Sequence, residues 1–155
     1  MDDELTFTFT FILEFIFIMI LIWVGLHFFI KDDLSEITKH YSEITATTGG
    51  FTTTQYENFL DDLREINIDP NECDITIKAI DDDGNDISSK AINVTPTNES
   101  PYPADPNFCP RGTQITLTVV SNKESALNKV FKFIGIDSDI KKGVAKKVYM
   151  SERVR

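Results

Sequence analysis

Basic residues are scarce in this chain, and their scarcity excludes one class of partner. Among 155 residues there are 15 lysines and arginines against 25 aspartates and glutamates, which gives a formal net charge of −10 at pH 7. Proteins that bind the phosphate backbone of nucleic acids carry clustered lysine and arginine. We therefore expect no nucleic-acid partner. We interpret the late basic residues between Lys141 and Arg155 as a solvated strand edge, in preference to a surface for anionic lipid headgroups.

Residues that build catalytic and metal sites are also few. The only histidines, His27 and His40, and two cysteines make a poor zinc site, and no phosphate-binding loop or nucleophile–base pair stands out. The acidic run Asp81–Asp86 lacks the ligand pattern of an EF-hand, because Ala79 stands where an acid or amide is required five residues before Gly84. The run instead predicts a hairpin turn with Gly84 in a left-handed conformation. We expect no metal, no cofactor and no enzymatic activity.

The two cysteines, Cys73 and Cys109, leave two alternatives open. Because a hydrophobic segment precedes them, we place the domain outside the cytoplasm, where a disulfide persists. A Cys73–Cys109 link would close a loop of about 36 residues and stabilise the fold by roughly 3–4 kcal/mol. The alternative is a pair of unlinked thiols in a reducing compartment.

The longest apolar run, Phe11 to Ile30, predicts a helix that is apolar on every face. Its length of roughly 30 Å matches the hydrocarbon core of a bilayer, and it needs lipid or other apolar helices all around it. The run is too long for a cleaved signal peptide, acidic residues precede it, and no small-residue cleavage site follows, so we expect the chain to keep it. Trp23 and His27 near its end suit a membrane–water interface.

Glu14 is the carboxylate inside this run, where a charge costs roughly 2.5–3.5 kcal/mol. Two interpretations are open. Glu14 stands only four residues into the run, close enough to its start to reach lipid headgroups. Alternatively, a neighbouring subunit supplies a positive partner in an assembly whose core is made of these apolar helices.

The whole sequence predicts an α+β fold. Beyond the apolar run, four residues at helical spacing are expected to hold an amphipathic helix against a sheet: Leu34, Ile37, Tyr41 and Ile44. The helix should stop at Gly49–Gly50. We divide the chain into a leader or N-terminal extension (1–10), a transmembrane or filament-core helix (11–30), its amphipathic extension (31–50) and an extracellular α+β head domain (51–155).

The head domain begins with a second helix, in which Thr54 and Glu57 have capping-box spacing, and which ends near Asp69–Pro70. Alternating apolar residues then predict antiparallel strands. The segment Val130–Ile136 is either a further strand or a segment that packs against the long helix. The predicted strands cover Ile75–Ala79, Thr113–Ser121 and Val144–Met150, the last with a possible extension to Val154.

The segment between the first two strands is predicted to be a loop. Thr95–Gly112 contains five of the six prolines. Asn93 begins the tripeptide Asn-Val-Thr, which fits the acceptor pattern for N-glycosylation in a host that glycosylates its surface proteins.

A glutamate early in an apolar segment, followed by a long amphipathic helix and a small sheet, resembles type IV pilins and pseudopilins. The core Leu13–Ile16 looks like that of the TadE-like subunits of tight-adherence pili. The resemblance implies a lollipop-shaped α+β fold. It also implies cleavage by a prepilin peptidase between Phe9 and Thr10, which would leave Glu14 as the fifth residue of the mature chain. Because Phe9 replaces the family's small residue and the leader is acidic, a retained N-terminus stays an alternative.

The same resemblance implies a structural subunit that polymerises with copies of itself into a filament at the cell surface. Before assembly the subunit would be inserted in the cytoplasmic membrane, and a pilus assembly machinery would add it to the filament. Glu14 would be the assembly contact, paired with the N-terminal amine of a neighbour. The alternative function is a single-pass membrane component of a secretion or conjugation apparatus, or a surface-binding module. The apolar assembly contacts would be Phe11, Phe15, Ile18, Leu21 and Ile22.

Overall fold

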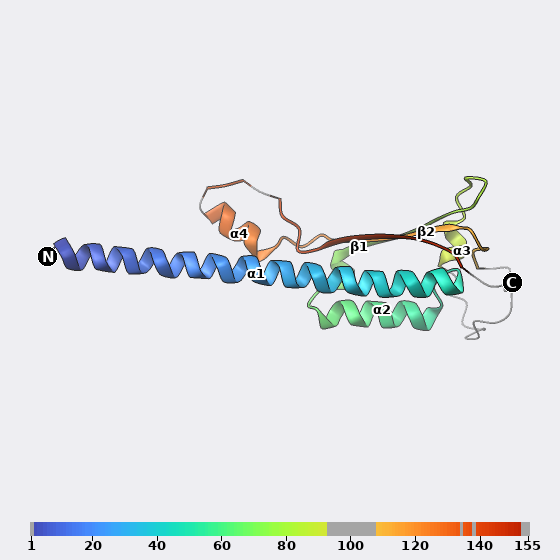
Figure 1. The fold of residues 1–155 in the computed structure, drawn as a ribbon, viewed down its shortest axis with the longest axis horizontal. Coiled ribbons are helices and arrows are strands. Elements are labelled where there is room, and N and C mark those ends of the chain that lie inside the picture. The colour runs from blue at the N-terminus through green and yellow to red at the C-terminus, as the bar shows by residue number, and fades with distance from the viewer. Residues whose placement is uncertain (1, 93–107, 134, 138, 153–155) are drawn as a thin grey trace.

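A computed structural model describes residues 2–92, 108–133, 135–137 and 139–152. It has an α+β fold, as predicted, in which a head domain lies along the second half of one long helix while the first half protrudes (Figure 1). The elements are α1 (Asp2–Thr48), α2 (Thr53–Glu65), a 3-10 turn η1 (Pro70–Glu72), β1 (Cys73–Ile80), α3 (Ser88–Ala91), β2 (Gln114–Ser121), α4 (Ala126–Phe133) and β3 (Val144–Met150).

Helix α1 is continuous over 47 residues, which makes it about 70 Å long. Apolar and polar residues alternate from Leu5 to Thr10, a pattern typical of a strand, but these residues belong to the helix. The helix ends at the predicted glycine pair. Gly49 adopts a φ of 81°, and its N–H donates to the carbonyl of Thr45 at 2.8 Å, which closes the last turn.

The sheet has three antiparallel strands in the order β1–β2–β3. The register places Cys73 opposite Ser121 and Gln114 opposite Met150. All three predicted strands are confirmed, and β3 ends at Met150, while Val154 lies outside the described residues. The turn after β1 is also confirmed: Gly84 has a φ of 84°, and its N–H donates to the carbonyl of Asp81.

Helix α1 lies between α2 and the sheet (Figure 1). Toward α2, the ring of Tyr41 lies 5.1 Å from that of Phe59 and 6.2 Å from that of Phe51, measured between centroids. Leu34 is fully buried close to Gly143, where an added Cβ would lie 2.6 Å from the leucine Cδ2. Leu34 and Tyr41 of the predicted stripe are therefore buried in the core, and Ile37 and Ile44 are partly buried against it. The expected partner is only partly right, because the ring contacts of Tyr41 are with Phe51 and with Phe59 of α2 and not with the sheet.

A second buried face of α1 was not predicted, because its residues are polar. Thr38, Ser42 and Thr45 are almost completely buried. Each hydroxyl donates to a carbonyl of its own helix: Thr38 to Leu34 at 2.6 Å, Ser42 to Thr38 at 2.6 Å and Thr45 to Ser42 at 2.9 Å. Small hydroxyl residues that are satisfied within the helix can be buried without an external partner.

Two local predictions are corrected. The capping box of α2 is formed by Thr52 and Gln55, not by Thr54 and Glu57: the Gln55 N–H donates to the Thr52 hydroxyl at 3.2 Å, and the Thr52 N–H donates to the Gln55 side chain at 3.0 Å. The helix also ends at Glu65, before the predicted Asp69–Pro70, since η1 takes up the segment that follows.

The described residues of the segment Val130–Ile136 do not form a strand. Its first residues belong to α4, which lies beside α1 (Figure 1), so the alternative of packing against the long helix is the correct one. Within α4, Leu127 and Asn128 are buried, whereas Lys129 and Lys132 are exposed, as in an amphipathic helix.

Candidate functional site: the protruding half of the long helix

The protruding half of α1 carries the predicted assembly residues on an exposed apolar surface. Among the described residues, α1 is the one helix long and apolar enough to cross a membrane, and its most apolar window is not buried in the chain. An apolar surface of this extent is typical of contact with lipid or protein. The five apolar residues predicted to be assembly contacts are at least half exposed: Phe11 62%, Phe15 59%, Ile18 54%, Leu21 54% and Ile22 51%.

Glu14 interrupts this surface as the one acidic or basic residue between Thr6 and Ile30, His27 aside. Every residue from Thr6 to Met19 is exposed, so the head domain does not cover this part of the helix. The residues one turn away, Thr10 and Ile18, carry no charge, and the Thr10 hydroxyl donates to the carbonyl of Thr6 at 2.9 Å. The chain has no lysine or arginine within one turn of Glu14 that could act as its cationic partner.

The predicted processing pair, Phe9–Thr10, lies inside α1, seven residues after the helix begins at Asp2. Both side chains are exposed. Cleavage there remains a prediction, and it would require the peptidase to act on a bond within a continuous helix.

The head domain meets α1 at His27, a contact that the sequence analysis missed. The His27 ring nitrogen Nδ1 lies 3.0 Å from the hydroxyl oxygen of Ser125, at the start of α4. Beside this contact is a cavity of about 430 Å³, which we call the junction cavity. Its lining includes Trp23, Leu26 and Ile30 from α1, and Lys123, Lys129 and Lys142 from the head domain.

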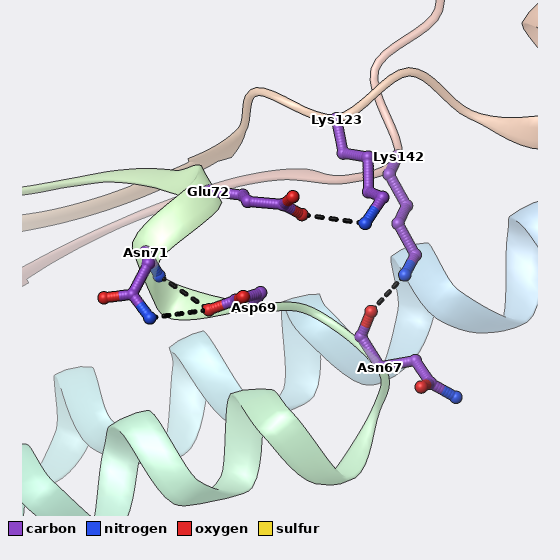
Figure 2. Close-up of polar contacts among 6 residues, drawn as sticks. All are labelled: Asn67, Asp69, Asn71, Glu72, Lys123 and Lys142. Carbon is purple, nitrogen blue, oxygen red and sulfur yellow. Dashed lines mark hydrogen bonds and ion pairs between the residues drawn. The ribbon is translucent and has the colours of Figure 1, made fainter.

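Two of these lysines approach each other from neighbouring segments (Figure 2). The ammonium of Lys123 pairs with the carboxylate of Glu72 at 2.9 Å, which raises the pKa of Lys123. Lys142 donates to the carbonyl of Asn67. Burial lowers the pKa of Lys142, and the nearby positive charge of Lys123 lowers it further. The cavity wall thus concentrates positive charge in a chain that is acidic overall.

The predicted disulfide is wrong: Cys73 and Cys109 are both thiols. Cys73 begins β1, whereas Cys109 lies beyond the opposite end of the sheet, where its N–H donates to the carbonyl of Gly49 at 2.9 Å. The length of an eight-residue strand, roughly 23 Å, separates the two ends, and a disulfide requires Cα atoms within about 7 Å. Sequence spacing alone could not show that the two residues lie at opposite ends of the sheet.

Asn93, the predicted glycosylation acceptor, and most of the proline-rich loop lie outside the described residues. Comparisons with protein-family models, with curated proteins and with solved structures found no match.

Proposed function

We propose that this chain is a structural, pilin-like subunit that is anchored in a membrane by α1 and polymerises through the protruding half of that helix. The observation that carries the proposal is Glu14, a single carboxylate on an apolar helical surface that the head domain leaves uncovered. Two further steps support it: the position of the head domain along α1, and the depth at which this position would place Glu14.

The junction cavity limits how far α1 can enter hydrocarbon. Lys123 and Lys129 line this cavity together with Trp23. Charged side chains are costly in hydrocarbon, whereas tryptophan favours the interface. We therefore place the end of the membrane span near Trp23, several residues before the Ile30 boundary that hydropathy alone suggests.

With its end near Trp23, a span of about 20 residues begins near Glu4. Glu14 then lies about ten residues, roughly 15 Å, from either end and thus near the middle of the bilayer. At that depth the headgroups are out of reach, so the interpretation of Glu14 as an interfacial residue loses its support. A carboxylate at mid-bilayer needs either a proton or a cationic partner.

A neighbouring copy can supply that partner within a helical homopolymer. Cleavage between Phe9 and Thr10 would remove the first residues of this span, so the depth given for Glu14 applies to the uncleaved chain. In the cleaved chain the new N-terminal amine would lie one turn from Glu14, in position to neutralise the glutamate of an adjacent subunit. The exposed apolar residues around Glu14 would then pack against one another and form the filament core, with the acidic head domain outside. This arrangement matches the resemblance to type IV pilins and TadE-like subunits.

One observation favours a second candidate, a single-pass membrane component of a secretion or conjugation apparatus that stays in the bilayer. Lys31 lies directly after the apolar segment, on the side of the head domain. The positive-inside rule therefore favours a cytoplasmic head domain. The two thiols also remove the argument for an oxidising compartment that a disulfide would have given.

Electron microscopy of material sheared from cells that produce the chain, with mass spectrometry of its N-terminus, tests the proposal. Filaments that contain the chain, with Thr10 as the first residue, are the expected result. Recovery of the chain only in the membrane fraction, with no filaments, would instead favour the second candidate.

A further inference from the structure

We propose that the junction cavity binds the phosphate headgroup of an anionic lipid in the bilayer that holds α1. The cavity has an apolar wall on the helix and a basic wall on the head domain. Its volume of about 430 Å³ lies within the range of small-molecule sites. An amphiphile with a negative headgroup combines the two chemistries that these walls offer.

Not every lysine of the basic wall is paired with a carboxylate. Lys123 pairs with Glu72 at 2.9 Å, and Glu124, the acidic residue of the lining, pairs with Lys132 at 2.7 Å. In the part of the chain that the structure describes, Lys129 and Lys142 form no ion pair with a carboxylate. Lys142 donates to the Asn67 carbonyl and Lys129 lowers the pKa of Glu124, but an ammonium has three N–H donors, so both keep donors for a phosphate.

The surroundings of Lys142 also favour the binding of an anion. Its ammonium is partly desolvated and lies near that of Lys123, and both effects disfavour its positive charge. A bound anion would offset this electrostatic cost. Figure 2 shows both side chains extending toward the turn that carries Asn67, whose carbonyl accepts from Lys142.

The apolar wall is continuous with the membrane-facing surface of α1. Trp23 is half-buried in the cavity, and Leu26 lines it while remaining 49% exposed. A lipid whose phosphate lies against the lysines can therefore extend its acyl chains along α1 toward the protruding half. A free phosphate would use only the basic wall.

A lipid contact at this site would offset a repulsion that follows from the net charge of the chain. At −10, the protein as a whole is repelled by an anionic bilayer. Because Lys123 is paired with Glu72, it is Lys129 and Lys142 that leave positive charge at the place where the head domain meets the inserted helix. The inference rests on insertion of α1, which belongs to the proposed function, but not on polymerisation.

Trp23 is the only tryptophan of the chain, so its fluorescence reports directly on the cavity. The full chain is placed in nanodiscs of one fixed mixture of phosphatidylcholine and phosphatidylglycerol. In one sample the phosphatidylglycerol carries bromine on its acyl chains near the headgroup, and in the other the phosphatidylcholine carries it at equal bromine content. Surface charge is then identical, and a difference in quenching measures which lipid lies beside Trp23.

We expect stronger quenching by brominated phosphatidylglycerol. The preference should fall by about fivefold for each lysine removed in Lys129→Gln and Lys142→Gln, and Lys90→Gln on α3 should leave it unchanged. Equal quenching by the two lipids in the wild type, or a preference that survives removal of both lysines, would overturn the proposal. Loss of the preference on adding inorganic phosphate would overturn the lipid assignment in favour of a free-phosphate site. Loss of filaments with the lipid preference intact would count against polymerisation alone.

Discussion

His27 and Ser125 lie 98 positions apart in the sequence, and the imidazole Nδ1 of one is 3.0 Å from the hydroxyl oxygen of the other. The Ser125 oxygen also accepts the N–H of Leu127 at 3.2 Å and so caps α4, while the Ser125 N–H donates to the carbonyl of Ile140 at 2.8 Å. One residue thus starts α4 and joins it to α1. This junction marks where the head domain ends along α1 and where the protruding half of the helix begins.

Ser125→Ala should loosen α4. The substitution removes the cap and the contact with His27, which together contribute about 1–2 kcal/mol to the docking of α4. Amide hydrogen exchange of the full chain should be faster by about tenfold or more in Ala126–Phe133 and unchanged in the strands. Ser89→Ala, at an exposed serine of α3, is the matched control. Unchanged exchange in α4 would show that the junction does not depend on Ser125.

Gly143→Ala should destabilise the head domain by about 1–3 kcal/mol, because the new Cβ would lie 2.6 Å from the Cδ2 of fully buried Leu34. Chemical denaturation measures the loss. Gly25→Ala is the control, since a Cβ there has no neighbour within 4 Å. In the background of Leu34→Ala, which makes room, the cost of Gly143→Ala should nearly vanish, and full additivity of the two changes would contradict the contact.

Tyr41 should make the stability of the head domain fall at alkaline pH. Its hydroxyl donates to Asp62 at 2.8 Å, and its pKa is raised, first by burial and then by Asp62. Above about pH 10 the unfolded chain loses the tyrosine proton while the folded chain keeps it, so the free energy of unfolding decreases by up to about 1.4 kcal/mol per pH unit. The difference between wild type and Tyr41→Phe should shrink over this range. A difference that is independent of pH would contradict the raised pKa.

The architecture was predictable where one periodicity dominates a segment. The three strands alternate cleanly, and Leu34 and Tyr41 recur at helical spacing before a glycine stop. The segment Val130–Ile136 is a short, largely apolar run, for which strand and helix patterns cannot be distinguished. The buried Thr38, Ser42 and Thr45 count as polar in any pattern, although their own helix satisfies them.

The candidate site was only partly predictable. Glu14 stands out because hydrocarbon penalises charge, which the sequence alone shows. The junction cavity depends on contacts between residues about 100 positions apart, which a sequence does not show. The one local feature that could have indicated it is Ser125, a helix-capping residue type directly before an amphipathic segment. The cysteine pairing failed for the same reason: the sheet register, which sets which ends are close, is a tertiary property.

The two cysteines should differ in reactivity, which makes them a probe of topology. Cys73 is partly exposed, although burial raises its pKa and should slow its reaction, whereas Cys109 is completely buried. A membrane-impermeant maleimide should label one thiol of the native chain in intact cells if the head domain is outside. Cys73→Ser should abolish the labelling, and Cys109→Ser should not. Labelling only after cell lysis would place the head domain in the cytoplasm.

Glu14→Leu tests the central claim most directly, with the fraction of the chain recovered in sheared filaments as the readout. It removes the carboxylate and keeps an apolar helical surface, so membrane insertion should be preserved or improved. Glu14→Gln, which keeps the shape but not the charge, distinguishes an ionic contact from a packing contact. We predict that wild-type chain is found in filaments, whereas both variants stay in the membrane fraction with a folded head domain. Filaments of Glu14→Leu in wild-type amounts would contradict the account.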